Sequence, residues 1–195
     1  GARHVSSIRI PDLFDLNCTL AADLFEGMRQ PWEVLARIGE YIRKKGATLS
    51  ETEYDHPTEN VWIAKDAAVA VTAYLKGPLI VDSGAEIRHC AYIRGNVIVG
   101  KNAVIGNSTE LKNCILFDGV QVPHFNYVGD SILGAYAHMG AGAVTSNIRS
   151  DKKNIIVHGE KEIHTGLRKL CAMIGDRAEV GCGSVLNPGV ILGRD

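Results

Sequence analysis

The sequence has few of the features that mark nucleic-acid-binding or membrane-spanning proteins. Its 195 residues carry a formal net charge of -1, so total charge does not favour nucleic acid or an anionic membrane as a partner. No apolar run approaches the roughly 18 residues of a membrane-spanning helix, and no signal peptide is recognisable. We therefore expect a cytoplasmic protein with neither kind of partner.

Cysteine is also scarce and follows no pattern. The five cysteines form no CxxC pair, and an odd number cannot all pair within one chain. A disulfide framework is therefore not expected, which favours a reducing compartment. The simplest role for each cysteine is that of a small buried apolar residue.

Residues 1–58 predict an N-terminal helical segment followed by a linker. Helices are expected over 11–45, where PDLFDL resembles a helix start and Pro31 suits a first turn. Apolar residues then recur at helical spacing, and Gly46 can end the helix after three basic residues. Residues 47–58 are polar and rich in turn formers, and are assigned to the linker.

A period of six begins at residue 59. Aliphatic or aromatic residues recur without a miss at Ile63, Val69, Leu75, Val81, Ile87, Ile93, Val99, Ile105, Leu111 and Phe117. This period fits short strands joined by tight turns, with three strands to a coil of 18 residues. The fold predicted for residues 59–195 is mainly β, a parallel β-helix of hexapeptide repeats in which residues 18 apart stack.

Residues 147–172 interrupt the repeat. NIIV and EIHT flank HGEK and predict a small hairpin that projects from the coil. An excursion from a regular scaffold often carries function, because a loop can change while the scaffold stays the same.

Stacking at intervals of 18 predicts a ladder of cations on one side of the coil. Lys76, Arg94 and Lys112 have this spacing, and Glu110 lies on the same side of its strand as Lys112. Like charges at stacking distance repel each other unless water or an anion separates them. A phosphate or carboxylate site at Arg94 and Lys112 and a row of hydrated surface side chains are both compatible with this pattern.

A second candidate lies in VPHFNYVGDS, residues 122–131. The imidazole of His124 can accept a proton near neutral pH, as a base for an amine or hydroxyl nucleophile would. Pro123 restricts the preceding backbone, and Tyr127 adds a hydroxyl group. Without these neighbours, His124 would be interpreted as an ordinary surface residue.

A third candidate is GAGAVTSN, residues 140–147. Its small residues would let another molecule approach the backbone amides, although ordinary coil corners have the same composition. Basic residues of the excursion could meet nucleotide phosphates or simply be hydrated; they are Lys152, Lys153, Arg168 and Lys169.

HFNYVGDS, followed ten residues after Asp130 by GAGAVTSN, resembles the acetyltransferase domain of the bifunctional N-acetylglucosamine-1-phosphate uridylyltransferase/glucosamine-1-phosphate acetyltransferase family. The resemblance covers residues 59–195 and includes Arg94, Glu110 and Lys112. It implies a left-handed β-helix, a homotrimer, and acetyl-CoA bound between subunits as co-substrate. It also implies direct N-acetylation of an amino-sugar 1-phosphate.

The resemblance assigns roles to residues of this sequence. His124 would be the general base. The substrate-binding residues would be Arg94, Glu110, Lys112, Tyr127, His138 and Asn147. The acetyl-CoA-binding residues would be Ala141, Gly142, Lys153 and Cys182.

Two of the departures from the family bear directly on the expected activity. The nucleotidyltransferase domain is missing, so no uridylyl transfer is expected, and His138 stands where the family usually has Asn. The main alternative is a non-catalytic trimerising or regulatory β-helix module. A zinc carbonic anhydrase of the same fold is disfavoured, because the usual H-x4-H pair is missing and His158 and His164 lie in the excursion. No metal site is predicted.

Overall fold

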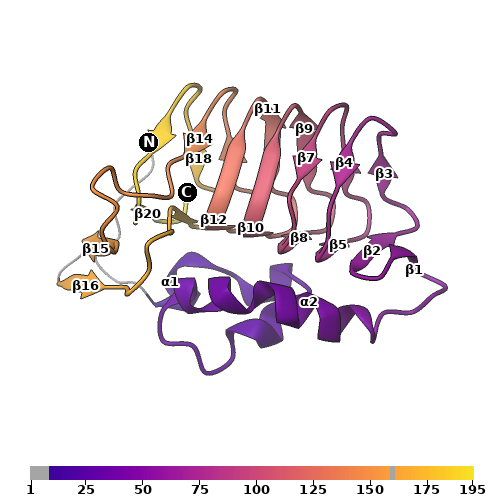
Figure 1. Cartoon of the computed structure of the whole chain (residues 1–195), viewed down its shortest axis with the longest axis horizontal. Coiled ribbons are helices and arrows are strands. Elements are labelled where there is room, and N and C mark those ends of the chain that lie inside the picture. The colour runs from indigo at the N-terminus through magenta and orange to yellow at the C-terminus, as the bar shows by residue number, and fades with distance from the viewer. Residues whose placement is uncertain (1–8, 159–160) are drawn as a thin grey trace.

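The computed structural model describes residues 9–158 and 161–195, which form a left-handed parallel β-helix covered along one side by the N-terminal segment (Figure 1). Within each coil the chain passes along three sides. Strands on the same side of successive coils pair in parallel. The predicted fold class is confirmed.

Each side is a column of short strands. The first side contains β2 (Val61–Ala64), β5 (Leu79–Val81), β8 (Val97–Val99), the second halves of β10 (Glu110–Leu116) and β12 (Tyr127–Leu133), β17 (Met173–Ile174) and β20 (Ile191–Leu192). The second side contains β3 (Ala68–Val69), β6 (Glu86–Ile87), β9 (Val104–Asn107), β11 (Gln121–His124), β13 (His138–Met139) and β18 (Glu179–Val180). The third side contains β4 (Tyr74–Leu75), β7 (Tyr92–Ile93), the first halves of β10 and β12, β14 (Val144–Thr145) and β19 (Val185–Leu186).

The aliphatic residues of the six-residue repeat fill the interior of the coil. Ile93, Ile105 and Leu111 are all 0% exposed. The first members of the series, such as Ile63 and Val69, are only half-buried because they lie in the first coil. Burial of this continuous apolar column is what stabilises strands of two or three residues, which would not persist alone.

The coil length changes from 18 to 17 residues where β10 begins. On the first side Leu79 pairs with Val97, but Val97 pairs with Cys114, one position earlier than constant spacing predicts. The corner between the third and first sides holds Lys112 and Asn113 where the previous coil has Arg94, Gly95 and Asn96. With one residue fewer, β10 and β12 each run through this corner as one strand.

The N-terminal segment packs against the first side. It contains α1 (Ile10–Leu13), the 3₁₀ helices η1 (Leu16–Cys18), η2 (Ala22–Phe25) and η3 (Pro31–Arg37), and α2 (Ile38–Gly46). The expected helix at 31–46 is therefore α-helical only in its second half. The three-residue turn of η3 aligns Trp32 with Leu35, and both are buried.

The first side has an outward row of apolar residues that this segment covers. In β2, β5, β8 and the second halves of β10 and β12, one residue points away from the coil interior and is nevertheless buried. These residues are Trp62, Ile80, Ile98, Ile115 and Ile132. The helical segment lies along this flank (Figure 1), and Phe14 contacts Phe117 with ring centroids 5.3 Å apart. The segment and the coil thus share one apolar core. The boundary at residues 58 and 59 stays a prediction.

Part of the expected linker is a strand. β1 (Tyr54–Thr58) pairs antiparallel with β2. This strand supplies hydrogen-bond partners to β2, whose edge would otherwise be open at the first coil. The hydroxyl of Tyr54 also donates to Asp82 at 2.7 Å. Turn-forming residues in ATLSETEYDHPT concealed the strand in the sequence.

The expected hairpin in the excursion is confirmed. β15 (Ile156–His158) and β16 (Glu162–His164) pair antiparallel, and an isolated bridge between Ile148 and Lys169 closes the base of the excursion. Residues 159 and 160 of the expected turn lie outside the described residues. In the part of the chain that the structure describes, every helix is too short or too polar to cross a membrane.

Candidate functional site

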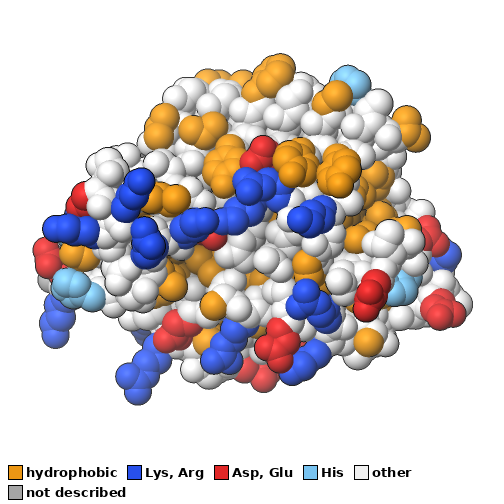
Figure 2. Space-filling view, in the orientation of Figure 1, with side chains coloured by type: hydrophobic (Ala, Val, Ile, Leu, Met, Phe, Trp, Pro, Cys, Tyr) orange, Lys and Arg blue, Asp and Glu red, His pale blue; other side chains and the backbone are white. Residues whose placement is uncertain are grey.

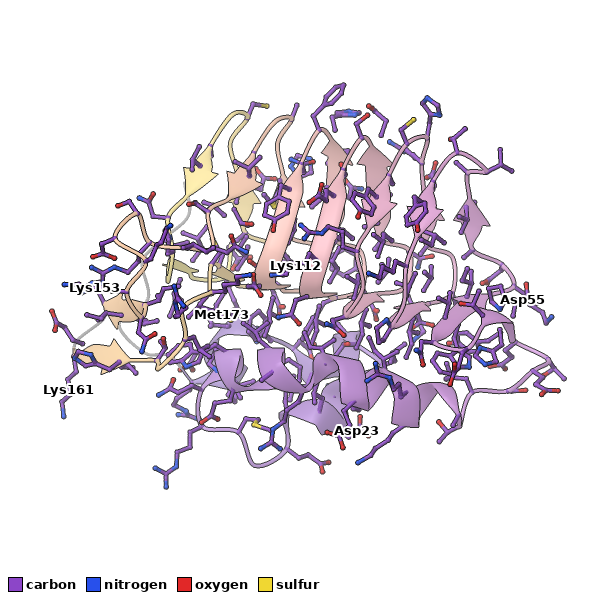
Figure 3. All side chains as sticks on the ribbon, in the orientation of Figure 1. Asp23, Asp55, Lys112, Lys153, Lys161 and Met173 are labelled. Carbon is purple, nitrogen blue, oxygen red and sulfur yellow. The ribbon has the colours of Figure 1, made fainter. Side chains whose placement is uncertain are left out.

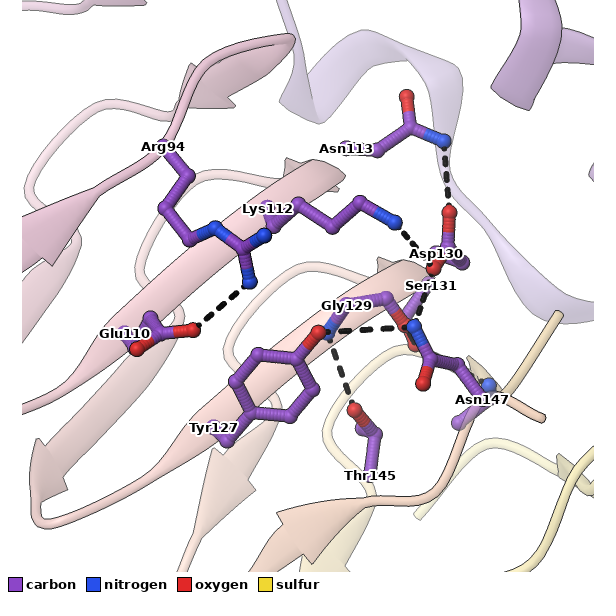
Figure 4. A network of polar contacts seen from close by, with 11 residues as sticks. Arg94, Glu110, Lys112, Asn113, Tyr127, Gly129, Asp130, Ser131, Thr145 and Asn147 are labelled. Atoms are coloured by element: carbon purple, nitrogen blue, oxygen red, sulfur yellow. Dashed lines mark hydrogen bonds and ion pairs between the residues drawn. The ribbon is translucent and has the colours of Figure 1, made fainter. Parts of the chain in front are cut away.

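The buried carboxylate of Asp130 is the centre of a polar network at the shortened corner (Figure 4). One of its oxygens lies 3.1 Å from the ammonium of Lys112 and also accepts a hydrogen bond from the amide of Asn147. Its other oxygen accepts from the amide of Asn113 at 2.9 Å. The carboxylate is thus fully engaged by donors although its side chain is only 5% exposed, as a buried charge requires.

The coil geometry explains why these three side chains meet. Asn113, Asp130 and Asn147 occupy equivalent corner positions in successive coils of 17 residues. Asn113 and Asp130 have φ of 48° and 49°, in the left-handed region that Asn and Asp tolerate better than most residues. The corner thereby stacks amide, carboxylate and amide in one column.

Tyr127 closes the network on the third side. Its hydroxyl lies 3.5 Å from the amide nitrogen of Asn147. Burial first, and then the charge of Asp130, raise the pKa of the Tyr127 hydroxyl. A Cβ at Gly129 would lie 2.4 Å from this hydroxyl, so glycine there leaves the ring its place.

Arg94 and Glu110 form a second, more exposed pair on the same side. The guanidinium donates to the carboxylate of Glu110 at 3.0 Å, and the two side chains are 42% and 35% exposed. The hydrogen bond that Arg94 donates to Glu110 is the main cause that raises the pKa of Arg94. The anions beside both Arg94 and Lys112 are therefore carboxylates of the chain itself, while Lys76 is exposed.

The third side also presents an outward row of side chains, most of them aromatic or aliphatic. Tyr74 pairs in register with Tyr92, and their rings contact edge to face with centroids 5.7 Å apart. The row continues in register through Glu110, Tyr127, Val144 and Val185. Figure 2 shows hydrophobic side chains above a line of Lys and Arg on the face turned to the viewer.

His124 lies at the end of β11, at the corner between the second and third sides. Val122 and Val128 are 0% exposed and fill the inward positions, whereas His124 is exposed and faces outward. Phe125, which follows it, has φ of 51° and is 61% exposed. The imidazole is therefore accessible to a substrate.

The same corner stacks His124 directly against the small residues of GAGAVTSN. The amide of Gly142 donates to the carbonyl of His124 at 3.0 Å, and the amide of Gly183 donates to the carbonyl of Ala141 at 2.8 Å. The predicted base and the predicted cofactor residues Ala141, Gly142 and Cys182 thus form one exposed column. A Cβ at Gly140 would lie 2.6 Å from the backbone nitrogen of Cys182, which explains the need for glycine in such tight coils.

His138 and Cys182 meet in a groove on the second side. The groove has a volume of about 560 Å³, and Gly140, Arg177 and Glu179 also line it. Lys153 lies elsewhere, exposed in the excursion beside β15 and well away from Lys112 (Figure 3). Its backbone amide donates to Asp151 at 3.0 Å.

Apart from Lys153, the predicted residues thus fall into two groups within one chain. Lys112, Tyr127 and Asn147 belong to the Asp130 network, with Arg94 and Glu110 beside it. His124, Ala141, Gly142 and Cys182 form the corner column, next to His138. Sequence reasoning missed Asp130 and Asn113 as members of the site; the change to a spacing of 17 could have found both.

No metal centre can be assigned from the described residues. Across 9–158 and 161–195, His, Cys, Asp and Glu side chains form no group of three or more that could hold a metal ion.

The fold and these corners define a hexapeptide-repeat protein with a left-handed β-helix. Residues 75–192 match the family described as the GMPPB C-terminal domain, and the chain belongs to this family. The chain is also similar to the acetyltransferase region of bifunctional GlmU proteins, as the resemblance in the sequence suggested.

Two curated relatives show the extent of this similarity. The bifunctional protein GlmU of Methanococcus maripaludis is 36% identical over 167 residues, which cover 85% of this chain and 41% of the relative. A bifunctional sugar-1-phosphate nucleotidylyltransferase/acetyltransferase of Sulfurisphaera tokodaii is 36% identical over 139 residues, covering 61% of this chain and 34% of the relative. The chain thus spans about two fifths or less of the length of these relatives.

Among solved structures, the perosamine N-acetyltransferase of Caulobacter crescentus in complex with CoA and GDP-perosamine matches 67% of this chain. The identity is 21%, the TM-score is 0.45, and 52% of that protein is covered.

Proposed function

We propose that this chain is an acetyl-CoA-dependent N-acetyltransferase that acts on an amino-sugar 1-phosphate of the glucosamine 1-phosphate type. One observation carries the proposal: the exposed His124 occupies the corner directly above Ala141 and Gly142, and its backbone carbonyl accepts a hydrogen bond from the amide of Gly142. A base for the amine and a surface open to an acyl-CoA would then be neighbours. The names of the relatives, which include an acetyltransferase, support the same reaction.

The reaction is a direct transfer. An ammonium is not a nucleophile, so the sugar amine loses its proton to the imidazole of His124 as its nitrogen attacks the thioester carbonyl. The carbon–nitrogen bond forms, the carbon–sulfur bond breaks, and the CoA thiolate leaves with the electron pair. A proton from the protonated imidazole or from water then restores the CoA thiol. No acyl-enzyme is required.

Arg94 is the group proposed to bind the sugar phosphate. Its guanidinium is more exposed than the ammonium of Lys112, and its partner Glu110 is a surface residue that can swing away. A dianionic phosphate competes well for guanidinium, which favours bidentate oxyanions. Lys112 would contribute charge from its place beside Asp130, and Tyr127 and Asn147 would form the wall of the site.

Assembly as a C3 homotrimer belongs to the same proposal. In the outward row of the third side, Tyr74 is 64% exposed, Tyr92 is 40% exposed and Val185 is 61% exposed. A partner subunit would bury these side chains. The two groups of site residues lie on different sides of one chain, so a neighbouring subunit could bring them together. Light scattering at micromolar concentration tests this: a monomer contradicts a site shared between subunits.

A cytoplasmic location is also proposed. The described structure contains five free cysteines, at least two of them exposed, which suits a reducing compartment.

The activity is tested by incubating the protein with acetyl-CoA and glucosamine 1-phosphate. CoA release should depend on both substrates, and mass spectrometry should find one acetyl group on the sugar nitrogen. Galactosamine 1-phosphate and unphosphorylated glucosamine test the choice of sugar and the need for phosphate. A folded protein that releases CoA with none of these amines contradicts the proposal.

A non-catalytic β-helix module is the second candidate. The observation that favours it is the pairing of both Arg94 and Lys112 with carboxylates of the chain, which leaves neither cation bare. Calorimetry separates the two functions. An enzyme binds the sugar phosphate and acetyl-CoA, whereas a purely structural module binds neither.

A further inference from the structure

Asn126 joins the two segments that the proposed function places around the acetyl group. It lies two residues after His124 and is 3% exposed. Its side-chain oxygen accepts a hydrogen bond from the backbone amide of His124 at 3.1 Å. Its side-chain nitrogen donates to the carbonyls of Gly140 and Ala143, both at 2.9 Å.

The side-chain amide has only one orientation that satisfies these contacts. The two carbonyls of Gly140 and Ala143 can only accept, so the NH₂ group with its two hydrogens must face them. The oxygen then faces the amide hydrogen of His124. The backbone amide of Asn126 donates to the hydroxyl of Thr109 at 3.3 Å, which anchors the residue to the preceding coil.

Hydrogen bonds hold His124 through both its backbone amide and its backbone carbonyl. Its carbonyl accepts from the amide of Gly142 at 3.0 Å, while its amide donates to Asn126. The side chain of Asn126 also donates hydrogen bonds to Gly140 and Ala143, the two ends of the segment that contains Ala141 and Gly142. Any shift of the corner that carries the imidazole must therefore break bonds to the turn that carries the candidate cofactor residues.

We propose that Asn126 is a positioning residue that fixes His124 relative to the 140–143 turn. This inference rests on the proposed function for its catalytic consequence. Asn alone combines the required acceptor with two donors at this length. Aspartate would keep the acceptor but turn an oxygen without hydrogen toward two carbonyls, and alanine would leave both carbonyls and one amide with no side-chain partner.

The kinetic test compares Asn126→Ala and Asn126→Asp with Asp82→Asn. Asp82 is a matched control, because it is also buried and bonded to Tyr54, Ser83 and Lys101, but it lies in the first coils away from the site. At a temperature where all variants stay folded, both Asn126 variants should lower kcat by about tenfold or more, since small misplacements of a catalytic group are costly. KM for the sugar phosphate should stay near the parent value, and Asp82→Asn should keep kcat within about twofold. An Asn126→Ala protein that loses thermal stability like the control but keeps its kcat overturns the proposal.

Hydrogen exchange gives a readout that does not need activity. In Asn126→Ala the amide of Gly142 should exchange faster, whereas the amide of Gly183, one coil further on, should keep its protection. If the parent transfers no acetyl group, the proposed function fails, but this comparison still decides the structural part. Equal protection of Gly142 in the parent and in Asn126→Ala overturns the coupling.

Discussion

The ammonium of Lys112 lies 3.1 Å from Asp130 in an ion pair whose lysine end is 23% exposed and whose aspartate end is 5% exposed. Arg94, by contrast, pairs with a partner that is itself at the surface. Removal of Lys112 would therefore leave a buried carboxylate without one of its partners, whereas removal of Arg94 would leave a carboxylate that water can reach.

Arg94→Ala and Lys112→Ala should both weaken binding of the sugar phosphate, by roughly tenfold or more, because each removes a charge near the anion. Only Lys112→Ala should also lower the free energy of unfolding, by about 1–3 kcal/mol, because it strips a buried carboxylate of one partner. Calorimetry and urea unfolding measure the two effects. Lys76→Ala is the control and should change neither quantity. Equal stability of the Arg94 and Lys112 variants would contradict this distinction.

His124→Ala should lower turnover by about 10²–10⁴-fold while keeping assembly and acetyl-CoA binding, because a positioned base is lost and the fold does not use the imidazole. Steady-state rates, light scattering and calorimetric titration with acetyl-CoA measure these effects. Turnover within a few-fold of the parent would point to His138 instead.

The cysteines should differ sharply in reactivity. Burial raises the pKa of Cys171 to about 12 and also raises the pKa of Cys114, so both thiols should react only after unfolding. Cys90 and Cys182 are exposed and should react in the native protein. CoA should protect Cys182 and leave Cys90 unprotected, as peptide mapping after labelling would show. Equal protection of both thiols would argue against a cofactor groove at Cys182.

Alkaline stability should depend on Tyr54. Burial, and then its hydrogen bond to Asp82, raise the pKa of the Tyr54 hydroxyl above its ordinary value of about 10. The folded state then binds this proton more tightly than the unfolded state. The stabilisation is complete below about pH 10 and is lost as pH rises toward the folded pKa. In Tyr54→Phe the free energy of unfolding should therefore fall less steeply between about pH 10 and 11 than in the parent. Chemical unfolding at a series of pH values measures this slope. An unchanged slope would show that Tyr54 is not the group responsible.

The coil could be predicted from the sequence because its cause is local. One aliphatic residue in six must point inward, and that requirement repeats visibly at Ile93, Ile105 and Leu111. The outward position of His124 followed from the same rule, since Val122 and Val128 fill the inward places.

The partners of the site residues could not be predicted, because they depend on register. A constant spacing of 18 does not align Asn113, Asp130 and Asn147, whereas a spacing of 17 stacks them. Strand β1 was missed because its partner β2, and not its own sequence, makes it a strand. The role of Asn126 depends on two carbonyls 14 and 17 residues further on, which no local pattern marks.

The covered row at Ile80, Ile98 and Ile115 has a consequence for how copies of this molecule can associate. A three-sided prism with one side already occupied by its own chain has only two sides left to offer. If one of these sides meets the other on the next copy, the contact is heterologous and each added copy turns through a fixed angle. Such contacts close into a ring where that rotation permits and extend into a filament where it does not. The N-terminal segment thus removes one of the three sides of the prism from lateral contacts between copies.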